Sequence, residues 1–222
     1  MAVQIQGNGG TVGEVETNTR AYRVTQRPTD VGSLGAYSLG VITGVLGAGL
    51  GANSEIFQFR WTHATNLMLL RSIVISASTS TLAFVAGVPI QIEARHARTW
   101  SADGTGGTAL VFSTANTNKK RTSFALSSAS DTGVRIATTA ALGAGTKTLD
   151  TNPFASLAVS GQAAAAVTLI QPGTYLWQRN TGDEYPVVYA QNEGFVVRSV
   201  AVPATGTWTV ALTIEWQELA SF

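Results

Sequence analysis

Two histidines and one adjacent pair of carboxylates are the residues best suited to proton transfer or metal binding. His63 and His96 stand apart in the sequence, and neither belongs to an H-E-x-x-H pattern, which places two zinc-binding imidazoles one helical turn apart. Asp183 and Glu184 are neighbours, so on a strand their carboxylates would point to opposite faces. We therefore expect satisfied or solvent-facing histidines, a solvated carboxylate turn, and no metal site.

Serine and glycine are abundant, but their spacing matches no catalytic or phosphate-binding motif. The chain has no G-x-S-x-G elbow, and Gly47–Gly51 fits neither G-x-x-x-x-G-K-S/T nor G-x-G-x-x-G. The absence of cysteine excludes thiol catalysis and Cys-ligated zinc. A glycosidase carboxylate pair stays open, because its members can lie far apart in sequence. We expect a non-enzymatic protein with no catalytic residue and no cofactor.

The basic residues are too few for a nucleic-acid partner. Lys119–Arg121 is the longest run of like charge, and with Arg95 and Arg98 it would meet either nucleic acid or acidic groups of a neighbouring protein. The 14 Lys and Arg are balanced by 13 Asp and Glu, for a net charge of +1, whereas nucleic-acid-binding domains carry a clear basic excess. The near-zero net charge therefore favours acidic groups of a neighbouring protein over nucleic acid as the partner of these cations.

Charged residues make up 12% of the chain, about half of the ~25% usual for a globular domain. A membrane span is not the reason, because the longest apolar stretch, residues 39–52, is interrupted by glycines and shorter than the ~18 residues required. The first ten residues lack the basic start and apolar core of a secretory signal. The composition therefore indicates a protein without a membrane partner, whose surface is covered by other subunits.

Alternating apolar residues predict strands as the elements that carry these side chains. Phe57, Phe59 and Trp61 share one face, with Gln58 and Arg60 on the other. The longest alternation places five large residues on one face near the C-terminus: Trp208, Val210, Leu212, Ile214 and Trp216. We expect residues 194–202 and 207–216 to form a hairpin around a loop at 203–206.

Two segments are ambiguous. Residues 66–77 are almost continuously apolar and fit a buried strand or a short helix leading into one. Residues 153–167 combine a proline at a first helical position with an alanine run, which favours a short helix, and a mid-segment glycine, which opposes it. The pattern as a whole predicts an all-β protein, a β-sandwich or jelly-roll-like domain over 31–222, with at most one short helix.

Residues 1–30 differ from the rest, being polar and without apolar periodicity. They predict either a flexible tail or an extended arm that becomes ordered on a neighbouring subunit. In the second case the spaced charges of this segment would make the contacts: Glu14, Glu16, Arg20, Arg23 and Arg27.

Four stretches resemble a family of small virion structural proteins of tailed bacteriophages. They are GEVETNTRAYRVTQRPTDVGSLGAYSLG, ANSEIFQFRWTHATNLMLL, AALGAGTKTLDTNPF and YPVVYAQNEGFVVRSVAVPATGTWTVALTIEWQE. The chain is similar in kind to capsid decoration, or cement, proteins, which are charge-poor β-sandwich or jelly-roll modules, commonly trimeric, with arms that lie across the capsid lattice. The resembling stretches have no catalytic meaning.

The resemblance implies that residues 1–30 are an anchoring arm and that the remaining domain forms the trimer. The partners would be the phage major capsid protein and copies of the chain itself. The protein would be made in the host bacterial cytoplasm and end on the capsid surface. Three weakly binding arms on one trimer would act at high effective concentration.

Two other readings remain open. The chain would also suit another virion component, such as a head fibre, a tail or adaptor protein, or the major shell protein, although it lacks the long helix expected of the last. A glycan-binding sandwich for host attachment is the other reading. In that case Trp100, beside the glycine-rich loop 101–108, would be the surface residue that stacks on a sugar.

Overall fold

The chain divides into two units, residues 1–31 and residues 32–222. The computed structural model describes residues 5–6, 12–13, 34–47, 50–84, 90–114, 118–159, 165, 168–180, 186–201 and 205–220. In the first unit, β1 (Ile5–Gln6) pairs antiparallel with β2 (Val12–Gly13). The five charged residues predicted to anchor an arm lie outside the described residues: Glu14, Glu16, Arg20, Arg23 and Arg27. The arm therefore stays a prediction.

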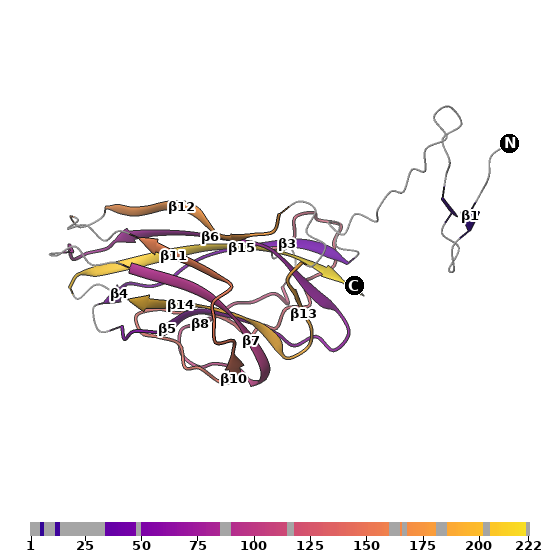
Figure 1. The fold of residues 1–222 in the computed structure, drawn as a ribbon, viewed down its shortest axis with the longest axis horizontal. Helices are drawn as coiled ribbons and strands as arrows, with labels where there is room; N and C mark the ends of the chain where they lie inside the picture. Colours follow the sequence, from indigo (N-terminus) through magenta and orange to yellow (C-terminus); the bar gives the residue numbers. More distant parts are fainter. Residues whose placement is uncertain are drawn as a thin grey trace, which may run out of the picture. The chain divides into compact units, whose positions relative to one another are not determined.

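The second unit is built from two antiparallel sheets, which form the two layers of Figure 1. The six-stranded sheet has the order β12 (Leu169–Gln178), β6 (Leu67–Thr79), β15 (Thr207–Leu219) and β3 (Gly35–Ile42), with β13 (Val188–Tyr189) on β6 and β4 (Leu46–Gly47) on β15. The seven-stranded sheet has the order β10 (Thr146–Leu149), β7 (Ile90–Ala102), β14 (Glu193–Ala201), β5 (Ser54–Trp61), β9 (Val134–Ile136) and β8 (Thr108–Ala109), with β11 (Ala155–Val159) on β7. The predicted all-β sandwich is confirmed, and the jelly-roll connectivity stays a prediction.

Aromatic side chains from both sheets fill the space between the layers. The predicted inward faces are confirmed, because Phe57, Phe59 and Trp61 of β5 and the five large alternating residues of β15 are all buried. Phe59 meets Trp216 edge to face, with ring centroids 5.3 Å apart, and stacks on Phe195 at 5.6 Å. Such ring pairs add about 0.5–1.5 kcal/mol each beyond the burial of their area.

The predicted C-terminal hairpin is wrong. β14 pairs with β5 and β7, whereas β15 pairs with β3, β4 and β6. The two strands therefore belong to different sheets, and the connection between them crosses from one layer to the other. Each of the two strands has an apolar face and lies in its sheet with a partner strand on both sides. Adjacent strands in the sequence therefore did not pair with each other.

The first ambiguous segment forms a strand, and so does the part of the second that lies in residues 155–159. Residues 67–79 are the long strand β6, which has neighbours on both sides. Within residues 153–167, where a short helix was considered, residues 155–159 are β11, in register with β7 from Ala155 opposite Ala94 to Val159 opposite Ile90. Most of the alanine run at 163–166, on which the helix prediction depended, lies outside the described residues. The described residues contain no helix.

Candidate functional site

A cluster of one carboxylate and two arginines lies on β7 and β14 of the seven-stranded sheet. Glu93 faces Arg198 across the strand pair, and both Arg198 and Arg95 donate to its carboxylate. Burial raises the pKa of Glu93, but the hydrogen bonds and charges of the two arginines outweigh it, so that the net shift is downward. This carboxylate is held ionised as an acceptor, which suits a structural ion pair better than proton donation.

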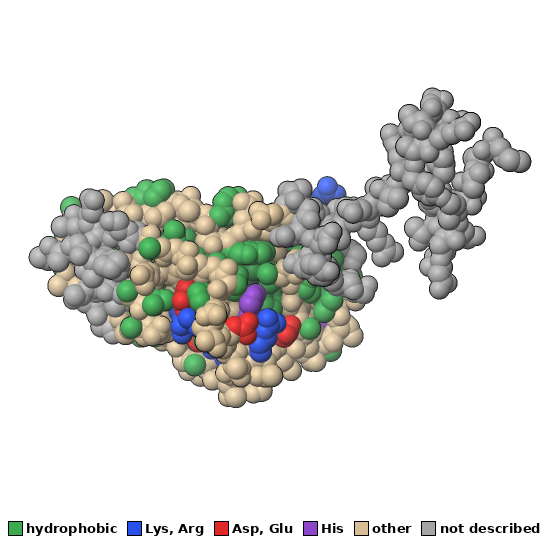
Figure 2. Space-filling view, viewed as in Figure 1, with side chains coloured by type: hydrophobic (Ala, Val, Ile, Leu, Met, Phe, Trp, Pro, Cys, Tyr) green, Lys and Arg blue, Asp and Glu red, His purple; other side chains and the backbone are tan. Residues whose placement is uncertain are grey.

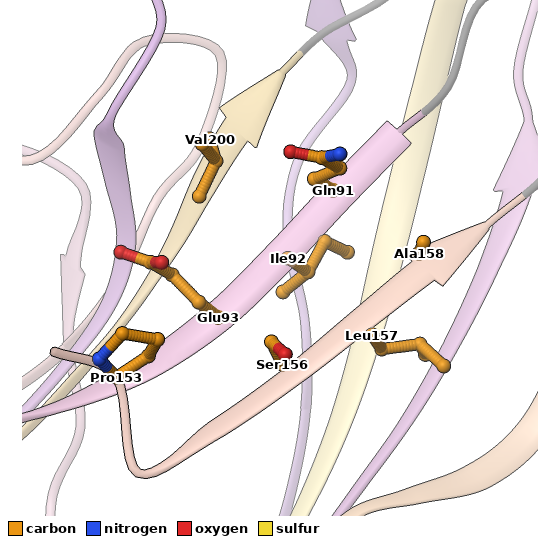
Figure 3. Close-up of a pocket in the computed structure, with 8 residues that line it drawn as sticks. All are labelled: Gln91, Ile92, Glu93, Pro153, Ser156, Leu157, Ala158 and Val200. Carbon is orange, nitrogen blue, oxygen red and sulfur yellow. The ribbon is translucent and has the colours of Figure 1, made fainter.

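A shallow hollow of about 270 Å³ lies beside this cluster. Figure 3 shows it between three strands, with Gln91 and Glu93 on β7, Ser156 and Ala158 on β11, and Val200 on β14. Among the described residues that line it, Glu93 is the only charged one, and it is already engaged by arginines. The hollow therefore offers little chemistry of its own.

The predicted satisfied histidines are confirmed. The Nδ1 atom of His96 lies 2.8 Å from the hydroxyl of buried Tyr189, and its ring stacks on Phe154 with centroids 4.2 Å apart. Burial lowers the pKa of His96 and raises that of Tyr189, so both are neutral near pH 7. His63 accepts the backbone N–H of Asn66 at 2.9 Å within a turn.

A wider groove of about 530 Å³ lies where β7 and β14 meet the turn before β14. Its charged residues already pair with each other, because Arg98 donates to Glu193 at 3.1 Å and to Asp150 at 3.5 Å. Thr99 and Asn192 line the groove with φ angles of 47° and 63°.

Figure 2 shows charged side chains in two groups on this layer, whereas the other layer is mostly tan and green in this view.

Trp100 is not the surface stacking residue that was predicted. Its side chain is completely buried, its Nε1 donates to the carbonyl of Ala102 at 2.9 Å, and Lys147 Nζ lies 4.6 Å from its ring centroid. The ring packs with Ala97 on the outward side of the seven-stranded sheet, next to Thr99, whose φ is positive. Two residues of β10, Lys147 and Leu149, lie against it there. A sugar cannot stack on this ring.

Sequence reasoning missed a buried ion pair on the outward side of β5. Lys147 Nζ lies 2.8 Å from Glu55 Oε2, and Gln58 Nε2 donates to the same oxygen at 2.5 Å. Gln58, predicted to face outward, is fully buried there, because the segment around Gly143 lies over it. Glu55 and Lys147 are far apart in sequence, and no local pattern signals their meeting.

The block Lys119–Arg121 lies apart from Arg95 and Arg98. Asn118 and Lys120 are hydrogen-bonded to β3 of the six-stranded sheet, and the Lys120 ammonium lies 2.7 Å from Glu215 of β15. Arg95 and Arg98 are on β7 of the other sheet. The structure therefore does not join these cations into one basic patch.

Part of the outward side of the six-stranded sheet carries no charged side chain. In one row across the strands, Tyr175, Val74, Thr213 and Gly40 lie side by side. The next two rows continue this pattern with Ser76, Ala211 and Ile42, and with Leu169, Ser78 and Thr209. We call these ten residues the outer face.

Three large apolar residues of the outer face are more than half exposed: Ile42 at 62%, Leu169 at 61% and Tyr175 at 54%. Between them lie hydroxyl and methyl groups, and Ser78 Oγ is 3.0 Å from Thr209 Oγ1. The nearest charged pair, Lys120 and Glu215, marks one end of the surface. An uncharged, partly apolar sheet surface is chemically suited to packing against another protein.

The family models, the curated proteins and the solved structures with which the chain was compared contain no match. In the part of the chain that the structure describes, no group of three or more His, Asp or Glu residues could hold a metal ion. The same residues include no helix of the length and hydropathy needed to cross a membrane.

Proposed function

We propose that this chain is a non-enzymatic structural protein of a phage virion, which binds the head shell as an oligomer and stabilises it. The observation that carries the proposal is the uncharged outer face of the six-stranded sheet. The resemblance of four long stretches to tailed-phage virion proteins supports it independently. The major capsid protein would be the partner, and the arm predicted at residues 1–30 would make the anchoring contacts.

The charge-poor surface supports a role inside an assembly. A free protein with a net charge of +1 gains little protection against self-association from charge repulsion. In an assembly the same property is favourable, because apolar and hydroxyl groups can be buried at an interface with a smaller desolvation cost than charged groups.

A different virion component, such as a head fibre or a tail or adaptor protein, is the second candidate. It uses the same surface chemistry and differs in the number and position of copies on the particle. Host attachment through Trp100 is no longer proposed, because that ring is buried.

Electron microscopy tests the proposal. The purified chain is added to capsids assembled from the shell protein encoded in the same genome, and the density is compared with that of bare capsids. A decoration protein gives extra density repeated over the whole lattice. Density at a single vertex would instead identify a tail or adaptor component, and no added density would contradict the proposal.

A further inference from the structure

The outer face includes a glycine that the fold itself does not require. Gly40 lies in β3, and a Cβ atom built on it would have no other atom within 4 Å. Its φ lies outside the left-handed region in which glycine is favoured. Glycine weakens a strand, and in strands it often marks a place where another backbone approaches closely. At Gly40 no described residue of the chain makes such an approach, and a second molecule has room to do so.

The chemistry of the outer face is complementary to itself. A hydroxyl group both donates and accepts hydrogen bonds, so Ser76, Thr209 and Thr213 can bond to the same groups of an identical face. Two identical faces without charge do not repel each other, whereas a cationic or anionic face would repel its own copy. The exposed ring of Tyr175 and the exposed aliphatic groups would be buried in the same contact.

The area limits the contact to a weak one. The outer face spans about seven residues of β12, five each of β6 and β15, and three of β3. With about 3.3 Å per residue and about 4.8 Å between strands, this is roughly 320 Å². Two such faces bury roughly 640 Å², below the ~1,000 Å² of stable interfaces, although pleating and side chains add to this value, so the pairing should be transient.

From these three observations we propose that two copies of this chain pair through their outer faces, sheet on sheet, about a two-fold axis. Such a contact is isologous, with each face burying the same residues of its partner. This pairing would be the contact between copies in the oligomer of the proposed function. It rests on the proposed function only for the claim that the oligomer acts on a capsid. The building unit would then be a dimer, and not the trimer that the resemblance implies.

Sedimentation velocity over a wide range of concentration tests the pairing. The wild-type full chain should shift from monomer to dimer as its concentration rises. Gly40→Lys should raise the dissociation constant at least tenfold, because the lysine enters the contact while its Cβ meets open space within the chain. Thr213→Lys, at an exposed position in the same row, is the second variant. Gln91→Lys, exposed on the seven-stranded sheet, is the matched control and should associate like wild type.

Circular dichroism melting of each variant confirms that the fold is retained. A wild-type chain that stays monomeric, a trimer, or lysine variants that dimerise as well as wild type would each overturn the pairing. Capsid binding separates this result from the proposed function. A variant that no longer dimerises but still binds capsids with lower occupancy supports the pairing and leaves the decoration role intact.

Discussion

At the scale of single residues, the polar interior of this protein is built from a few fully engaged charges. Glu55 and Lys147 meet under the segment that covers β5, with side chains 9% and 2% exposed. Glu93 is held by two arginines on the same sheet. Each group has its partner at hydrogen-bonding distance, so these residues fix the covering loops and are not poised for catalysis.

Removing one member of the buried pair should be costly. Lys147→Met leaves the Glu55 carboxylate buried without its cation, and we expect a loss of about 3–5 kcal/mol in the free energy of unfolding. Urea denaturation measures it. The double variant Glu55→Gln with Lys147→Met should recover much of the loss, because no unpaired charge then remains. Equal stability of the single variant and the wild type would show that the pair is not buried in solution.

Glu93 makes the stability of the fold depend on pH in one direction. Because the pKa of Glu93 is lower in the folded chain than in the unfolded one, its contribution is complete above the ordinary Glu value of about 4.3. It is lost as the pH falls through the folded pKa. The difference between thermal melts of wild type and Glu93→Gln should therefore be complete at pH 7 and shrink as the pH falls below the ordinary Glu value. A constant difference at every pH would contradict the assignment.

At the scale of elements, alternation predicts which face of a strand is buried but not which strand is its neighbour. The inward faces of β5 and β15 followed from the period of two in their sequences. The partners did not, because the apolar strand β14 could pair equally well with any complementary strand, and only the complete sandwich places it between β5 and β7. Trp100 was predicted to be exposed because it precedes a glycine-rich loop, whereas β10, paired with β7 from far along the chain, covers its ring.

Thr99 is strained in its present conformation. A β-branched residue at φ 47° is uncommon, and glycine adopts this region without steric cost. Thr99→Gly should therefore raise the free energy of unfolding by about 0.5–1 kcal/mol, measured by thermal or urea denaturation. Ser101→Gly, two residues along the same strand, is the control and should lower it. Destabilisation by both changes would mean that the irregularity is held by side-chain contacts of the threonine.

At the scale of the whole molecule, the chain divides after residue 31. In the proposed function, the second unit is the folded domain and the segment before it binds the capsid. Deleting residues 2–27 removes none of the strands of the second unit. We expect this variant to melt as cooperatively as the full chain and to lose most of its capsid occupancy, measured by co-sedimentation. The full chain treated in parallel is the reference. Unchanged occupancy would show that the sandwich, and not the segment before it, makes the contacts with the shell.

The position of β15 between two other strands of its sheet also has a consequence for synthesis on the ribosome. β15 lies between β6 and β3, so these strands have no central partner until residues 207–219 have left the exit tunnel. Pairings between residues so distant in sequence form slowly, because a long loop must close first. The nascent chain must therefore keep β3 and β6 apart from the strands of neighbouring chains until β15 has been made. A holding chaperone would be most useful in this interval.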